Sequence, residues 1–192
     1  MRARFMGEAA VLLLLSASIY FLGNQFQNYF LQKTEYAPGV NWIYLPAGLR
    51  VLLVLVAGVW GALGICFSTL LIDLQQQGHF ADGMLWVTAL LSGFGAWAAL
   101  HAMHVLGRID RNLKGLQLGQ LLEFALLYAV VSCLGQHLIG WFFGKEAHHW
   151  YIDIWPMLVG DLAGAASVLL LFRWSLRHIK NLLPQRIGDD QT

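Results

Sequence analysis

Residues 41–73 read NWIYLPAGLRVLLVLVAGVWGALGICFSTLLID, and this stretch decides the fold. As one α-helix, its apolar part, 43–72, would be about 45 Å long, whereas the hydrocarbon core of a bilayer is about 30 Å thick. A single helix would have to tilt by about 48°, which exceeds the usual range. Gly58, Gly61 and Gly64 lie near the middle, where a turn needs residues without a side chain. We therefore expect the segment to enter the membrane, turn and return, as a re-entrant pair or as two short helices.

The composition indicates a membrane protein. Of the 192 residues, 58% are hydrophobic and 12% are charged, whereas soluble domains carry about 25% charged residues. The formal net charge of +1 provides no basic excess that would indicate nucleic-acid binding. Cys66 and Cys133 both lie in apolar runs, so the sequence predicts neither a disulfide framework nor a zinc site of the Cys-x-x-Cys kind.

Four further segments are long and apolar enough to cross a bilayer, with short polar stretches between them. They are Glu8–Gln25, Gly83–Leu106, Leu118–Phe143 and Ile154–Leu176. The first could be a signal peptide, but its apolar run continues past the small residues of the supposed cleavage site, so we expect a transmembrane helix. The expected fold class is all-α: a polytopic integral membrane protein of about five helices plus the broken, glycine-interrupted pair. Residues 1–178 would form a single transmembrane domain and 179–192 a short basic and polar tail.

The distribution of lysine and arginine predicts which side of the membrane each end occupies. If the segment 43–72 returns to its starting side, most of the basic residues lie in the cytoplasm together with both termini. Aromatic residues agree with this arrangement, because one group falls near the same external interface, where such rings prefer to lie. These residues are Trp42, Tyr44, Trp141, Trp150, Tyr151 and Trp155. We expect a multi-pass protein of the bacterial inner (cytoplasmic) membrane, with the lipid bilayer as its immediate partner.

Arg50, Glu123 and Asp161 are charged residues placed well inside apolar segments. An intramembrane charge costs at least about 2.5 kcal/mol, so each of them needs a partner or a function. Pro46 suits the first turn of a helix, and Arg50 follows one turn later. Asp161 lies about 12 Å into the last helix from its external end, at a similar depth. Arg50 and Asp161 could form a structural ion pair, or they could bind an anionic or zwitterionic ligand.

Gly160 and Gly164 have the Gly-x-x-x-Gly spacing that permits close helix approach, and Asp161 lies between them. Packing is the simpler interpretation, and it would also bring Asp161 against its partner. The candidate ligand-binding residues from the two segments are Arg50, Asp161, Pro46, Gly48, Trp155, Gly160 and Gly164.

Histidines raise the question of a metal or haem site. His101 and His104 share one face of a helix, and Glu123 lies at a comparable depth in the following helix. A metal or haem site would need such spacing, because neutral imidazoles coordinate readily. A hydrogen-bonded His–Glu contact is the simpler interpretation, so these residues are weak candidates, and we expect neither a metal nor a cofactor. A second polar group near the external loops could bind a divalent cation or sense pH, although exposed loop histidines usually do neither. Its members are His79, Asp82, His137, His148, His149 and Asp153.

Motifs of enzymes are absent from the sequence. We recognise no activated nucleophile, no phosphate-binding glycine loop and no zinc-protease helix, so we do not expect an enzyme.

The segment 173–186 reads RWSLRHIKNLLPQR, with basic residues at helical spacing beside leucine and isoleucine. This pattern predicts that the last helix continues along the inner membrane surface. There it would attract anionic lipid or dock a partner protein.

Two passages resemble a known family. NWIYLPAGLRVLLVLVAGVWGALGICFSTLL is similar to a helix with a tryptophan before Pro-Ala-Gly, followed by a glycine-rich second arm that contains tryptophan. YIDIWPMLVGDLAGAASVLLLF is similar to a helix with a tryptophan before Gly-Asp-x-x-Gly. In this order they resemble the MASE-type membrane-associated sensor domains of bacterial signalling proteins. The resemblance implies a sensory module that signals to a cytoplasmic output such as a diguanylate cyclase or histidine kinase. The motif residues that it implies are Pro46, Ala47, Gly48, Trp155, Gly160, Asp161 and Gly164.

The chain also departs from that family. Leu45 stands where a second proline is usual, and Ala57–Trp60 replaces basic residues at the turn. Family members also have more membrane spans and a fused output domain, which we do not find up to Thr192. We therefore expect a sensory module that acts in trans on a cytoplasmic or membrane signalling protein through its basic tail. The alternatives are a small transporter or its substrate-binding subunit, and a structural subunit that anchors a larger assembly. The sequence does not determine the oligomeric state, and a homo-oligomer is one of the open alternatives.

Overall fold

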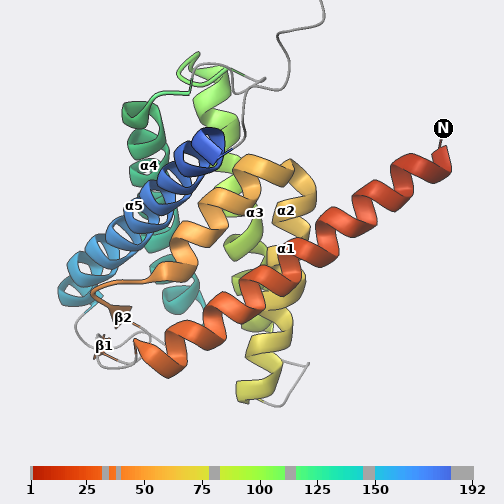
Figure 1. Cartoon of the computed structure of the whole chain (residues 1–192). Coiled ribbons are helices and arrows are strands. Elements are labelled where there is room, and N and C mark those ends of the chain that lie inside the picture. Colours follow the sequence, from red (N-terminus) through yellow and green to blue (C-terminus); the bar gives the residue numbers. More distant parts are fainter. Residues whose placement is uncertain are drawn as a thin grey trace, which may run out of the picture.

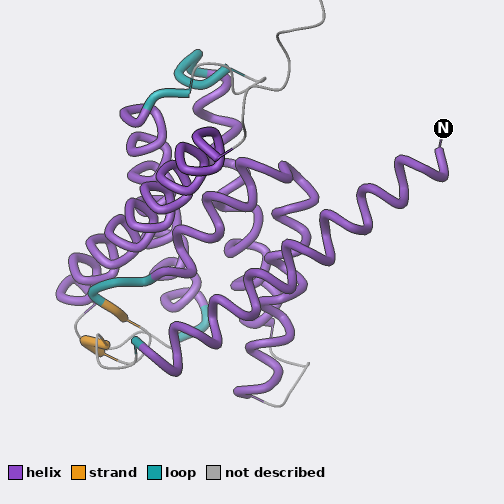
Figure 2. The backbone as a smooth tube through the Cα atoms, viewed as in Figure 1, coloured by secondary structure: helices purple, strands orange, loops and turns teal. Residues whose placement is uncertain are grey.

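The computed structural model describes residues 2–31, 35–37, 40–77, 83–110, 116–144 and 150–182, and they are almost entirely helical (Figures 1 and 2). The elements along the chain are α1 (Arg2–Phe30), β1 (Glu35–Ala37), β2 (Val40–Asn41), α2 (Leu45–Gln77), α3 (Gly83–Val105), α4 (Leu118–Phe142) and α5 (Trp150–Leu182). The short antiparallel hairpin pairs Glu35 with Asn41. It lies in one of the short polar stretches between the predicted spans.

All five helices are long and apolar enough to cross a membrane, which indicates a multi-pass membrane protein. The candidate spans are Met6–Phe30, Leu45–Gln76, Gly83–Val105, Leu118–Phe142 and Ile154–Ser175. They correspond to the five apolar segments recognised in the sequence, and most of their ends agree within a few residues. One part of the prediction is wrong, because the described residues contain four helices besides the glycine-interrupted α2, not five.

The interrupted helix α2 bends at Gly58. This residue has φ 57° and ψ −132°, a combination that only glycine adopts readily, and helical geometry resumes on either side. A Cβ atom at Gly61 would collide with the backbone carbonyl of Leu53, so the absence of a side chain lets the two arms lie close together just after the bend. The second arm continues to Gln77, beyond the predicted end at Ile72.

Figure 1 shows how the bend arranges the bundle. The first arm of α2 starts near β2, rises to the bend in the upper part of the view, and the second arm descends again. As a result, the N-terminal end of α1 and the C-terminal end of α5 lie toward the same, upper end of the bundle, and the β-hairpin lies at the other.

The core of the bundle forms around α2, which contacts α1, α3, α4 and α5. Apolar side chains from all five helices meet there, and large aliphatic groups remain on the outside, as expected for a surface that faces lipid. The largest buried hydrophobic side chains include Tyr20, Val51, Val54, Ile65, Leu85, Phe124, Tyr128 and Leu169. A buried glutamine, Gln27 of α1, holds the start of α2 in place. Its side chain donates to the carbonyl of Ile43 (3.0 Å) and accepts from the amide of Leu45 (3.2 Å).

The last helix, α5, continues without a break from Trp150 to Leu182, past the end of its apolar span at Ser175. The predicted helical continuation is therefore confirmed as far as Leu182. Residues 183–192, the remainder of the tail, lie outside the described residues.

Candidate functional site

Arg50 is buried in the bundle and bonded to tyrosines from three parts of the chain. Its side chain is 5% exposed. Nε donates to the hydroxyl of Tyr20 (2.7 Å), Nη1 to that of Tyr128 (2.9 Å) and Nη2 to that of Tyr44 (3.4 Å). The guanidinium carbon also lies 5.3 Å from the ring centre of Tyr20 and 5.6 Å from that of Tyr44. These neutral partners satisfy hydrogen bonds and add cation–π attraction, but they do not cancel the positive charge.

Asp161 on α5 is the most deeply buried carboxylate among the described residues, at 2% exposure. Ser132 of α4 lies beside it. The second carboxylate oxygen, Oδ2, is buried and has no hydrogen-bond partner within the protein. A buried polar atom without a partner is costly, so Oδ2 requires an explanation such as a bound water or a ligand.

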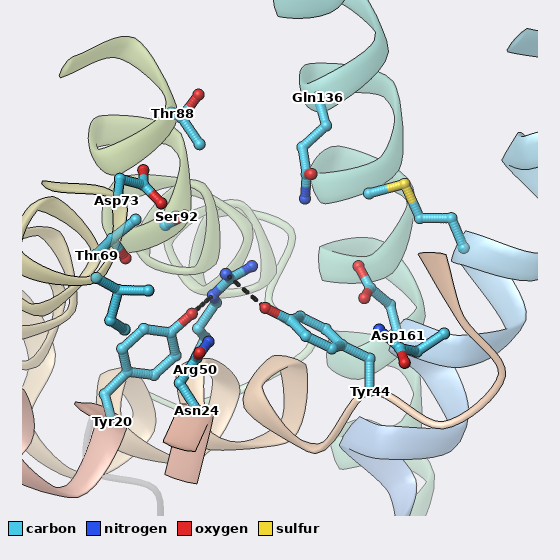
Figure 3. A pocket seen from close by; sticks show the side chains of 13 residues that line it. Tyr20, Asn24, Tyr44, Arg50, Thr69, Asp73, Thr88, Ser92, Gln136 and Asp161 are labelled. Atoms are coloured by element: carbon cyan, nitrogen blue, oxygen red, sulfur yellow. Dashed lines mark hydrogen bonds between the residues drawn. The ribbon is translucent and has the colours of Figure 1, made fainter. Parts of the chain in front are cut away.

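Arg50 and Asp161 lie on the wall of one cavity of about 160 Å³, to which all five helices contribute. Its lining residues are Tyr20, Asn24, Asn41, Tyr44, Arg50, Thr69, Ile72, Asp73, Thr88, Ser92, Gln136, Met157 and Asp161. All but Ile72 and Met157 are polar, although the helices around them are apolar. Figure 3 shows the guanidinium of Arg50 between two groups of side chains: Asp73, Thr69, Thr88 and Ser92 on one side, Asp161 and Gln136 on the other.

The sequence places Arg50 and Asp161 at similar depth, and the structure brings both to this cavity without a direct ion pair between them. The arginine instead donates to the three tyrosine hydroxyls. In Figure 3, the ring of Tyr44 extends from the Asp161 side of the cavity, and its hydroxyl is bonded to Arg50. The expected structural ion pair is therefore replaced by a cavity that holds both charges apart.

The glycines of α5 set the position of Asp161. A Cβ atom at Gly160 would collide with the carbonyl oxygen of Asn41, and one at Gly164 with that of Tyr44. The amide of Tyr44 donates to the carbonyl of Gly160 (3.0 Å). The close approach expected from the Gly-x-x-x-Gly spacing is thus present, and its partner is the segment just before and at the start of α2.

The other candidates near Arg50 and Asp161 lie outside the cavity wall. Pro46, in the first turn of α2, and Gly48 are buried, and Gly48 contacts α5 close to Gly164. Trp155 is 68% exposed, and Gly160 and Gly164 make the backbone contacts described above. The three glycines therefore act through the close contact between α5 and the start of α2, and Trp155 does not line the cavity.

The candidate metal group around His101, His104 and Glu123 is not assembled. Glu123 forms a two-point ion pair with Arg108, with Nε–Oε2 at 3.0 Å and Nη2–Oε1 at 2.6 Å. His101 stacks on Trp97, with ring centres 5.5 Å apart, and His104 lies in the last turn of α3. Within the part of the chain that the structure describes, no three His, Cys, Asp or Glu residues form a group that could hold a metal ion.

The second polar group, near the external loops, falls mostly outside the described residues. This applies to His79, Asp82, His148 and His149, and the side chain of Asp153 is not described either. His137 is described, and its Nδ1 lies 2.8 Å from the carbonyl oxygen of Cys133 in the preceding turn.

The roles of the three tyrosines and of Asp73 at the cavity were not predicted from the sequence. Tyr44 was assigned to an aromatic belt at the interface, but its hydroxyl bonds to a buried arginine. Trp42, Trp141 and Trp155 of the same group are exposed, as belt residues should be. Polar side chains on one face of an otherwise apolar helix, such as Thr69 and Asp73 four residues apart on α2, were the available signal.

No family model, no curated protein and no solved structure matches the chain.

Proposed function

We propose that this protein is a sensory module of a bacterial inner membrane, which binds a ligand in the cavity and acts in trans on a cytoplasmic signalling partner. The observation that carries the proposal is the position of Asp161. This buried carboxylate lies on the cavity wall with Oδ2 unpartnered, and it belongs to the same uninterrupted helix, α5, that ends at Leu182.

The continuity of α5 supplies the coupling. From Asp161 to Leu182 the helix extends by about 30 Å. A ligand that binds Asp161 favours one position of α5 over another, and the basic end of the helix moves with it. The cationic segment 173–186 would then change its contact with anionic lipid or with the partner protein.

The orientation in the membrane is part of the same proposal. The positive-inside rule favours cytoplasmic termini when the segment 43–72 doubles back. The bend at Gly58 and the shared position of the two helix ends in Figure 1 support that reading. The cavity then lies in the external half of the bundle, among residues near the β-hairpin end, where an external ligand could reach it. The resemblance to MASE-type sensor domains agrees with this division into an outer binding region and an inner output.

Pulsed electron paramagnetic resonance tests the coupling. Two spin labels are placed at Leu106→Cys and His178→Cys, both exposed positions, in a protein with Cys66→Ala and Cys133→Ala. Asp161→Asn should shift the distance distribution between the labels, because it changes the charge of the cavity on the moving helix. Glu8→Gln makes the same chemical exchange at an exposed carboxylate of α1 and should leave the distribution unchanged. Identical distributions for Asp161→Asn and the parent would contradict the proposal.

A small transporter, or the substrate-binding subunit of one, is the second candidate. The bend at Gly58 and the polar cavity favour it, because many carriers build their sites from interrupted helices. Uptake of a labelled solute into proteoliposomes that contain only this protein would support the transporter against the sensor.

A structural anchor is the third candidate. It predicts that a variant ending at Arg177 loses its assembly partner regardless of Asp161.

A further inference from the structure

The cavity contains buried groups of both signs that are not paired with each other, which restricts the ligand it suits. We propose that it binds a small α-amino acid, with the carboxylate on Arg50 and the ammonium group on Asp161. This inference rests on the proposed function, since it names the ligand class of the same site.

Arg50 provides the carboxylate end. Its three hydrogen bonds all go to neutral hydroxyls, so no carboxylate contacts the guanidinium directly, although Asp161 and Asp73 line the same cavity. A guanidinium has five N–H groups in a planar fork, so this one keeps donors beyond those used by the tyrosines. The tyrosines fix the fork in one orientation, which reduces the entropy lost when a carboxylate binds to it.

Asp161 provides the ammonium end. Its Oδ2 is buried on the cavity wall without a hydrogen-bond partner in the protein. An ammonium group carries three donors and no acceptor, which complements this acceptor. The hydroxyl oxygen of Thr69, across the cavity in Figure 3, is buried and equally unpartnered within the protein.

A ligand of a single charge fits less well. A simple cation would lie beside the guanidinium of Arg50, and a simple anion would face the carboxylates of Asp161 and Asp73. A zwitterion places each charge against its opposite and adds no net charge to a buried site. Size gives the second limit, because a cavity of about 150 Å³ accommodates benzene, a molecule of about six non-hydrogen atoms. The 160 Å³ here therefore suits glycine, alanine or serine.

Titration calorimetry of the full chain in phosphatidylcholine nanodiscs tests the ligand class. Glycine, L-alanine and L-serine are titrated separately, with acetate, methylammonium and L-tryptophan as probes of charge and size. At least one small amino acid should bind at least about tenfold more tightly than acetate, methylammonium and tryptophan. Equal or tighter binding of acetate or methylammonium, or no binding of any small amino acid, would overturn the inference.

Variants assign the two ends of the ligand. Asp161→Asn should weaken amino-acid binding by at least about tenfold, because the neutral amide removes the negative charge opposite the ammonium group. Asp73→Asn is the matched exchange on the opposite wall and should weaken binding less; a larger effect there would contradict the assignment. Glu8→Gln is the control outside the cavity. Thermal unfolding of each variant shows whether weaker binding reflects a lost contact or a lost fold, and a misfolded Asp161→Asn is replaced by Asp161→Ser.

The label pair at Leu106→Cys and His178→Cys separates this inference from the proposed function. If no amino acid binds but Asp161→Asn still shifts the label distance, the ligand class is wrong and the coupling stands. If an amino acid binds but neither it nor Asp161→Asn shifts the distance, the cavity binds the amino acid and the sensory coupling is wrong.

Discussion

Arg50 on α2 and Asp161 on α5 line the same buried cavity without forming an ion pair. Three tyrosine hydroxyls bind the guanidinium, and Oδ2 of the carboxylate is left without a partner in the protein. A pair meant only to hold two helices together would place the charges in contact, because the attraction offsets part of the desolvation cost only at short distance. The observed separation supports the proposed ligand site.

Removing the buried guanidinium should destabilise the bundle strongly. Arg50→Met would leave Asp161 and Asp73 without a nearby cation, and three tyrosines without a donor. Removal of one partner from a buried charge network costs about 3–5 kcal/mol of unfolding free energy. Unfolding in mixed detergent–SDS micelles measures the change. Arg108→Gln, which breaks an exposed ion pair, is the control and should cost much less. Equal losses for the two variants would contradict the network.

The tyrosine hydroxyls should contribute in the order of their bond lengths. A hydrogen bond to a charged group contributes about 1.5–3 kcal/mol. Tyr20→Phe and Tyr128→Phe remove bonds of 2.7 and 2.9 Å, whereas Tyr44→Phe removes one of 3.4 Å. We expect the first two to cost more unfolding free energy than the third. Tyr29→Phe, at an exposed tyrosine of α1, should have little effect.

The contact between α5 and the start of α2 should not tolerate a methyl group. Gly160→Ala would force a Cβ atom against the carbonyl of Asn41, and overpacking of this kind costs about 1–3 kcal/mol. It should also shift Asp161 and weaken ligand binding. Gly119→Ala is the matched control in α4, where a Cβ atom meets nothing within 4 Å. Because Gly119 lies in the first turn of α4, alanine there should stabilise the helix by at most about 0.5 kcal/mol. Two changes of the same sign would contradict the account.

Gly58 should be required for its backbone conformation alone. A Cβ atom there would meet nothing within 4 Å, but φ is +57°. Gly58→Ala should therefore cost about 1–3 kcal/mol of strain without any steric clash. A straightened α2 in that variant would separate the two arms and disperse the residues of the cavity.

The apolar segments could be predicted from the sequence because each is a long run with few charges, and their order agrees with the observed helices, although α1, α2 and α5 extend beyond the predicted limits. The bend was readable because three glycines interrupt a run too long for one span. Only part of the cavity could be predicted from the sequence. Arg50 and Asp161 stand out as charges in apolar surroundings, but Tyr20 and Tyr128 do not, since buried tyrosines in apolar helices are ordinary core residues. Which partner satisfies Arg50 depends on how the helices rotate against each other, and periodicity does not fix that rotation.

The central claim is that α2 doubles back, so that both of its ends lie on the external side together with the cavity. Single cysteines at Ile43, two residues before α2, and at Gln76, in its last turn, test it in a protein with Cys66→Ala and Cys133→Ala; both positions are exposed. A membrane-impermeant thiol reagent is added to intact bacterial cells, with His178→Cys as the cytoplasmic control. The account predicts labelling of both positions in intact cells and of the control only after permeabilisation. Labelling of Ile43→Cys and Gln76→Cys from opposite sides would contradict it.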